Sequence, residues 1–158
     1  TLRSRLSAAY KAINILVLRE GSQDWFWKAG VQELDVDEIA LDIHHIFPKD
    51  WCGKRNIHKD RYDSILNKTQ ISYKANRKIG GVAPSVYLPS IQGEKQVQLS
   101  DDEMNEILST HALSPELLRA DDFDGFIEAR RKALSELIGR AMGKPVVLAP
   151  DTGEYEEA

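Results

Sequence analysis

The apolar run LDIHHIFPK (41–49) constrains the fold more than any other part of the chain. It ends at Pro48, and this pattern predicts a short buried strand over 41–47. The run carries two adjacent imidazoles, His44 and His45, where purely aliphatic side chains would avoid the cost of burying polar groups. Because side chains alternate along a strand, the two histidines are expected on opposite faces, unless the end of the strand twists or bulges.

A second strand and a short helix are predicted further along the chain. The stretch NKTQIS (67–72) suits a strand with alternating faces, and Ser72 can cap the helix SYKANRKI, which ends at a Gly-Gly pair. Asn76 stands inside this helix, where asparagine is a poor helix former. Between the strands, 51–66 is polar, charged and irregular. The predicted order is therefore strand, long loop, strand and short helix.

Helices are predicted on both sides of this unit. Apolar residues recur at spacings of three and four over 2–19 and 122–142, and a glycine ends each run. Ser100 opens the capping box SDDE, and Ser114 precedes a proline that suits the first position of a helix. The stretch VAPSVYLPS is predicted to be a loop. These patterns favour an α+β fold in which helices wrap a strand pair.

Length and composition limit the class of protein. At 158 residues the chain can build one domain with a substantial core, which we expect to span 1–150. The residues DTGEYEEA (151–158) are expected to form a disordered acidic tail. The single cysteine, Cys52, excludes an internal disulfide and fits a reducing compartment. Because no apolar run is long enough to span a bilayer, we expect a cytoplasmic protein without a membrane partner.

The charge of the chain is unevenly distributed. The formal net charge of −4 comes from 21 basic and 25 acidic residues and argues against a nucleic-acid partner. Residues 44–78, however, hold nine Lys or Arg against three Asp, which leaves 12 basic and 22 acidic residues elsewhere. This middle region is therefore positive by six charges, and a phosphate backbone responds to such a local field. A solvated lysine-rich loop would give the same pattern.

Three motifs together resemble a known nuclease family. The segments DIHHIFP, ILNKTQIS and KANRKIGG resemble the HNH endonucleases of the ββα-metal (His-Me finger) class. More narrowly, HHIFPKDWC with NRKIGGVAPSVYL is similar to the C-terminal nuclease domain of GmrSD-type modification-dependent restriction proteins. The resemblance implies a ββα-metal core over 41–88, embedded in a mainly helical domain with flanks over 1–40 and 100–143.

The resemblance also implies roles for individual residues. His45 would be the general base that removes a proton from the attacking water, since an imidazole titrates near neutral pH. Asn67 would brace the loop and orient that base. His44 and Asn76 would be the metal ligands. Asp42, two residues before His44 and on the same face of the strand, could restore negative charge to the metal site.

The implied cofactor is a divalent metal, Mg²⁺ or Mn²⁺. Imidazole and amide donors are neutral, so Ni²⁺, Co²⁺ and Zn²⁺ would also be tolerated, and we expect Mn²⁺ to support cleavage at least as well as Mg²⁺. Lys49, Lys74, Arg77 and Lys78 are the expected contacts to DNA phosphates.

The function implied by the resemblance is a divalent-metal-dependent DNA endonuclease that leaves 3′-hydroxyl and 5′-phosphate ends. It would be the cutting or nicking module of an anti-phage restriction or defence protein. The expected partners are double-stranded and possibly modified DNA, and a nucleotide-dependent domain of the same protein that would precede Thr1.

Other readings of the same residues stay open. The scaffold could serve as a non-catalytic nucleic-acid-binding module, or as an RNase or toxin nuclease with the same core. His44 and His45 could be structural histidines, or could join Cys52 and His58 in a zinc site, although that set lacks paired CxxC spacing. The remaining histidine, His111, is expected at the surface. The three tryptophans are expected in core or loop packing.

Overall fold

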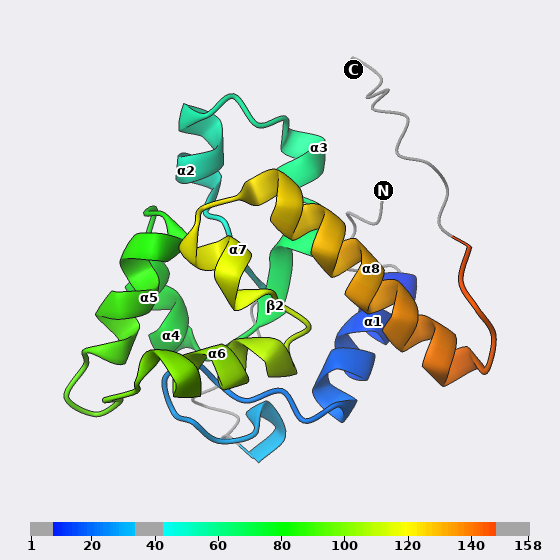
Figure 1. Ribbon diagram of the computed structural model, residues 1–158, viewed down its shortest axis with the longest axis horizontal. Coiled ribbons are helices and arrows are strands. Elements are labelled where there is room, and N and C mark those ends of the chain that lie inside the picture. The colour runs from blue at the N-terminus through cyan, green and yellow to red at the C-terminus, as the bar shows by residue number, and fades with distance from the viewer. Residues whose placement is uncertain (1–7, 34–42, 148–158) are drawn as a thin grey trace.

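The computed structural model describes residues 8–33 and 43–147. Figure 1 shows helices surrounding a small two-stranded sheet, so the predicted α+β class is confirmed. Asp42, the limits of the predicted domain at 1 and 150, and the predicted tail over 151–158 lie outside the described residues. The elements in chain order are α1 (Ala8–Arg19), η1 (Val31–Glu33), β1 (Ile43–His45), α2 (Lys49–Lys54), α3 (Lys59–Tyr62), η2 (Ile65–Asn67), β2 (Lys68–Gln70), α4 (Tyr73–Ile79), α5 (Pro84–Gln92), α6 (Asp101–Thr110), α7 (Pro115–Arg119) and α8 (Phe123–Met142).

The sheet is a single antiparallel pair. In its register His44 lies opposite Thr69 and His45 lies opposite Lys68. β2 is shorter than the predicted strand over 67–72, because the chain leaves the ladder at both of its ends, and β1 ends at His45 where 47 was predicted. At one end Asn67 belongs to a 3₁₀ turn, and at the other Ser72 caps α4, where its hydroxyl accepts a hydrogen bond from the backbone of Ala75.

A buried carboxylate joins the tryptophan-rich loop to this cap. Asp24 is fully buried and accepts hydrogen bonds from the backbone N–H groups of Phe26 and Trp27. It also accepts from the backbone N–H of Ser72 at 2.6 Å and from the Ser72 hydroxyl at 3.0 Å. Four donors satisfy the carboxylate, which is why an acidic group is stable there. The contact fixes α4 against the loop that follows α1.

The long helix α8 behaves as its apolar stripe predicts. Asp122 caps it and Gly143, in the left-handed region at φ 65°, ends it. Its buried Leu134 and Leu137 belong to a cluster with α1, and Phe126 belongs to the main core. The helix packs on α1, and its Arg130 donates a hydrogen bond to the carbonyl of Lys68 on β2.

Two of the predicted loops contain helices. The stretch 51–66 was expected to be irregular, yet it holds part of α2, all of α3 and most of η2. The loop predicted for VAPSVYLPS is wrong as well. Pro84 takes the first turn of α5, where a missing N–H is harmless, and the buried Tyr87 and Ile91 hold that helix in the core. Packing therefore outweighs the helix-breaking tendency of the prolines.

The prediction of a surface position for His111 is also wrong. Its side chain is fully buried and its ring meets Trp25 edge-on, with ring centroids 6.0 Å apart. The reason is a set of distant partners, since the imidazole joins Thr69 at 2.8 Å and the carbonyl of Gln23 at 2.7 Å. The tryptophans pack as expected, with Trp25 stacked on Tyr87 and Trp51 against Phe47.

Candidate active site around His45

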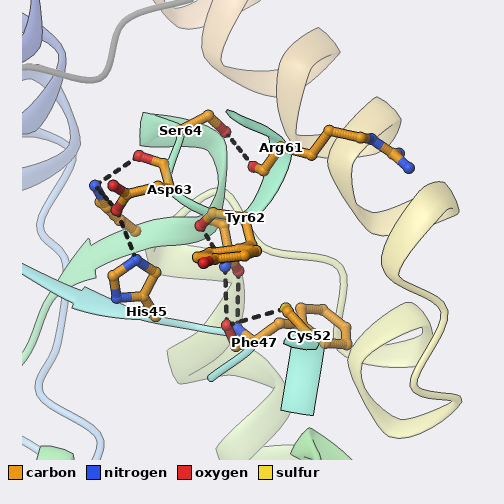
Figure 2. Close-up of polar contacts among 9 residues, drawn as sticks. His45, Phe47, Cys52, Arg61, Tyr62, Asp63 and Ser64 are labelled. Carbon is orange, nitrogen blue, oxygen red and sulfur yellow. Dashed lines mark hydrogen bonds and ion pairs between the residues drawn. The ribbon is translucent and has the colours of Figure 1, made fainter. Parts of the chain in front are cut away.

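His45 ends β1 and directs its ring toward a carboxylate. Its Nε2 lies 3.0 Å from Oδ1 of Asp63, and the Tyr62 ring meets the imidazole edge-on, with centroids 6.4 Å apart. Figure 2 shows the ring and the carboxylate facing each other across the gap between β1 and the end of α3. A carboxylate only accepts hydrogen bonds, so Nε2 carries the proton of the neutral ring. Nδ1, which has no hydrogen bond to a described residue, is left with its lone pair.

The surroundings keep this imidazole neutral. Burial lowers the pKa of His45 to about 4, and it outweighs the hydrogen bond to Asp63, which raises the pKa. The positive charges of Lys68 and Lys49 lower it further. The ring is therefore unprotonated at neutral pH and available to accept a proton. An anionic phosphate beside it would raise its pKa toward the working range of a general base.

Asp63 is held in turn by a buried lysine. Lys68, opposite His45 in the sheet, places its Nζ 2.8 Å from Oδ1 of Asp63 and donates to the Asp63 carbonyl at 2.6 Å. Burial alone would raise the pKa of Asp63, but the hydrogen bonds from Lys68 and His45 outweigh it and keep the pKa below its ordinary value. The carboxylate thus stays charged and fixed in its orientation.

Asn67 ties the chain together beside this group. The side chain is fully buried, and its Oδ1 accepts from the backbone N–H of Phe47 at 2.8 Å. Its Nδ2 donates to the carbonyls of Phe47 and Tyr62, both at 2.9 Å. These bonds join the backbone two residues after His45 to the backbone just before Asp63. Asn67 therefore connects the two ends of the segment between the strands, and its role in orienting a base stays a prediction.

His44, one of the two candidate metal ligands, lies on the other face of the hairpin from His45. His44 is opposite Thr69, whose hydroxyl points to His111, whereas His45 and Lys68 face Asp63. Strand alternation therefore separates the two histidines, as expected. His44 is buried on β1, and Asn76 is partly exposed on α4.

Within the part of the chain that the structure describes, no three His, Cys, Asp or Glu side chains cluster closely enough to hold a metal ion. A metal site would rest on the imidazole of His44 and the amide of Asn76, because Asp42 lies outside the described residues. In donor chemistry this neutral pair fits a borderline ion such as Mn²⁺ better than it fits Mg²⁺. Two protein donors also fill only part of the coordination shell of such an ion.

The alternative zinc site does not form. Cys52 is buried, its thiol donates to the Phe47 carbonyl at 3.7 Å, and burial raises the pKa of the thiol to about 12. His58 is exposed and caps α3, where its Nδ1 accepts from the backbone of Asp60 at 3.3 Å. With His44 and His45 on opposite faces, the four side chains do not converge.

The four predicted phosphate contacts have different surroundings. Lys49 is exposed at the start of α2. Lys74 lies over the rings of Phe26 and Trp27, at 4.5 and 4.4 Å, and donates to Gln96 at 2.8 Å. 

The other two also meet side chains of their own protein. Lys78 forms an ion pair with Glu94, and the Arg77 guanidinium lies 5.5 Å from the centre of the Tyr73 ring. Three of the four side chains predicted to bind DNA phosphates therefore already have partners within the protein.

Sequence reasoning missed Asp63 and Lys68 as parts of the site. Asp63 is separated from His45 by 18 positions, and its contact depends on how α3 returns to the strand. Lys68 was counted only as one basic residue among many. One available signal was its place directly after Asn67 at the start of the second strand, opposite the end of the first.

Comparison with known proteins gives one distant relative. The chain is 32% identical over 159 residues to the uncharacterized protein MJ0686 of Methanocaldococcus jannaschii, and the alignment covers 87% of this chain. The aligned region makes up 26% of that protein, so the chain spans about a quarter of the length of the curated relative it matches. No protein-family profile matches the chain. No solved structure matches it either.

Proposed function

We propose that this chain is a divalent-metal-dependent endonuclease of the HNH type that hydrolyses DNA phosphodiester bonds. In this proposal β1, β2 and α4 form the ββα-metal core, and cleavage leaves 3′-hydroxyl and 5′-phosphate ends. The observation that carries the proposal is the environment of His45. Its imidazole is neutral and partly buried, and its Nε2 is hydrogen-bonded to Asp63. Its Nδ1 has no hydrogen bond to any described residue.

The chain's own residues supply a route for the proton. Asp63 holds the Nε2–H tautomer, so the Nδ1 lone pair of His45 is the atom that takes a proton from an attacking water. Asn67 keeps the backbone on either side of this pair fixed, which orients the base without further reorganisation. His44 and Asn76 would hold the divalent cation, whose charge stabilises the leaving 3′ oxygen when it is bound.

His45 suits this role better than the other described histidines outside the proposed metal site. His111 is fully buried and both its ring nitrogens are engaged. His58 is exposed and its Nδ1 caps a helix. Only His45 combines partial exposure, a carboxylate on one nitrogen and a second nitrogen without a described partner.

Plasmid nicking tests the proposal directly. The chain is expected to nick supercoiled DNA with Mn²⁺ and to stop when EDTA is added. His45→Ala should lower the nicking rate by about 10²- to 10⁴-fold, the usual contribution of a general base. His58→Ala is the matched control and should leave the rate unchanged. Full activity in H45A, or no nicking with any divalent metal, would contradict the proposal.

The wider setting is part of the same proposal. We place the chain in the cytoplasm as the cutting or nicking module of a restriction or defence protein, joined to a nucleotide-dependent domain. In support, the aligned region of MJ0686 is one part of a much longer chain. No helix among the described residues is long and apolar enough to cross a membrane.

One observation favours a second candidate, a non-catalytic DNA-binding module on the same scaffold. The described residues hold no three-ligand cluster of His, Cys, Asp and Glu, so metal binding would depend on few donors. The nicking assay separates the two candidates, because a binding module would retain DNA and leave it intact. Parallel assays on single-stranded DNA and RNA test an RNase or toxin activity of the same core.

A further inference from the structure

The segment between the two strands begins and ends at His45. After β1 the chain forms α2 and α3 (Figure 1). At Asp63 it returns to the imidazole of His45. Asn67 fastens both ends, since it bonds the carbonyls of Phe47 and Tyr62. We call residues 48–62 the α2–α3 segment. Whatever binds to this segment lies beside the candidate base.

The exposed charge of this segment is almost entirely positive. From 49 to 59 it carries four cations against one carboxylate, Asp50, a net charge of three. All four cations are exposed, and none forms an ion pair with a described residue. The carboxylate of Asp50 lies against Gly81, where an added Cβ would come within 2.9 Å of it. The four cations are Lys49, Lys54, Arg55 and Lys59.

Two of these cations lie close to identified side chains. The guanidinium of Arg55 lies 4.0 Å from the centre of the Trp51 ring, which holds its planar group in position. Lys49 is near enough to His45 for its charge to act on the imidazole. By contrast, Arg61 at the end of the segment is already paired with Asp124 at 2.6 Å. Charge is thus left unpaired on the part of the segment that faces solvent.

The basic residues of α4 differ in this respect. Lys78 is neutralised by Glu94, and Lys74 lies over two aromatic rings and donates to Gln96. An ion pair within the protein must be broken before its cation can bind a phosphate, which weakens the contact. In a chain with a net charge of −4, the unpaired cations of the α2–α3 segment are therefore the stronger attractor for a polyanion.

We propose that Lys49, Lys54, Arg55 and Lys59 bind the phosphate backbone of duplex DNA and so bring a phosphodiester to His45. The choice of DNA rests on the proposed nuclease function. Ammonium groups bind phosphate as point charges, and the guanidinium adds paired hydrogen bonds. These contacts position the duplex and carry no sequence information.

Salt-dependent binding tests this surface without any cleavage. A fluorescein-labelled DNA duplex is titrated with the full chain in EDTA, and fluorescence anisotropy gives the affinity at several salt concentrations. The double variant K54Q/K59Q should weaken binding at least about tenfold and reduce the slope of log K against log[salt] by about two, since each phosphate contact contributes about 0.9. K49Q should reduce the slope by about one.

The matched control removes the same charge elsewhere. Lys11 on α1 and Lys132 on α8 are exposed, and K11Q/K132Q should leave affinity and slope as in the wild type. Far-UV circular dichroism checks that every variant is folded. An unchanged slope in K54Q/K59Q, a larger fall in K74Q/K78Q, or tighter binding of duplex RNA than of DNA would overturn the proposal.

The outcome is separable from that of the proposed function. A chain that binds DNA through these cations but does not nick it with Mn²⁺ supports the surface and contradicts the nuclease. A chain that nicks DNA while K54Q/K59Q binds as tightly as the control overturns the surface alone.

Discussion

His45 and His111 lie on opposite faces of the same hairpin and show that one titration behaviour can accompany two different environments. Burial lowers the pKa of each to about 4, so both rings are neutral at neutral pH. Their contacts differ. His45 is partly exposed and meets a carboxylate on one nitrogen, whereas His111 is fully buried and meets neutral partners on both.

The His111 side is a closed hydrogen-bond network. The Gln23 carbonyl can only accept, so Nε2 of His111 carries the proton and Nδ1 accepts from the Thr69 hydroxyl. Arg130, itself buried, donates to the carbonyls of His111 and Lys68 at 2.8 and 3.0 Å. This network ties α8 and the end of α6 to the underside of β2. Both ring nitrogens of His111 are engaged, so protonation of the ring would break the hydrogen bond from Thr69. A lowered pKa by itself therefore does not identify a catalytic histidine.

The largest expected effect is a reciprocal pair of losses. His45→Ala should lose nicking activity by about 10²- to 10⁴-fold and keep its free energy of unfolding within about 1 kcal/mol. His111→Ala should lose about 3 kcal/mol of stability, because it removes buried volume and two hydrogen bonds, and the folded protein should still cleave. Urea unfolding and plasmid nicking measure the two quantities. Comparable losses of stability in both variants would contradict the assignment of a catalytic role to His45 and a structural role to His111.

Acid should destabilise the fold through His111. The unfolded imidazole takes up a proton below its ordinary pKa of 6.5, whereas the folded one resists until about 4. Stability present above pH 6.5 is therefore lost as the pH falls, by about 2–3 kcal/mol between pH 7 and pH 4.5. Burial is the main cause of the shift, Arg130 adds to it, and the Gln23 carbonyl and Asp24 oppose it.

Replacing the titrating group isolates this contribution. His111→Gln should be less stable at pH 7 but should lose less on acidification than the wild type does, by about 2 kcal/mol. Urea unfolding at the two pH values gives the difference, and His58→Gln is the exposed control. An equal loss in H111Q and the wild type would assign the acid sensitivity to other groups, among them His45.

Asp63→Asn should have an intermediate effect on activity. Nε2 of His45 and Nζ of Lys68 both contact Oδ1 of Asp63, so the amide oxygen of the variant can keep both hydrogen bonds while the negative charge is lost. Without that charge the imidazolium that forms on proton uptake is less stable. Nicking should fall about 10- to 100-fold, while DNA binding in EDTA stays unchanged. Nitrogen-15 NMR of the imidazole should show the Nε2–H tautomer retained and the pKa of His45 lowered further, because the Asp63 charge raises it. An unaltered nicking rate together with an unaltered pKa of His45 would reduce Asp63 to a packing residue.

The smallest expected effect concerns the choice of metal. Nicking with Mn²⁺ should be equal to or a few times faster than nicking with Mg²⁺, since His44 and Asn76 offer neutral donors. Rates at saturating concentrations of each ion provide the comparison. Strict dependence on Mg²⁺ would argue against His44 as a ligand.

Local signals in the sequence predict part of this structure well. The capping box at Ser100 forms as written, with Glu103 bonded back to the cap, and the limits of α8 follow from its cap and from Gly143. Each of these features is decided by residues within a few positions of one another. The strand pair around His44 and His45 was also predictable, because its apolar run is bounded by a proline.

What could not be predicted depends on distant contacts. His111 lies in an unremarkable polar context, and its burial comes from Thr69 and Gln23, which are 42 and 88 positions away. The same holds for Asp63, which meets His45 after the Asn67 side chain has closed the intervening segment and Lys68 has bound the Asp63 carboxylate. Residue type and local spacing do not predict contacts between residues that are so far apart in the sequence.

The hydrogen bonds of Asn67 also make the geometry of the site independent of which residues form the middle of the α2–α3 segment. One amide fixes the exit and the return of the chain, so residues at the tip of the α2–α3 segment can be exchanged, shortened or lengthened while the base and its carboxylate keep their positions. Partner preference can therefore diversify there independently of the chemistry. For an engineer, 53–56 is the place to graft a new recognition loop, because Ile57 packs against the core and His58 caps α3.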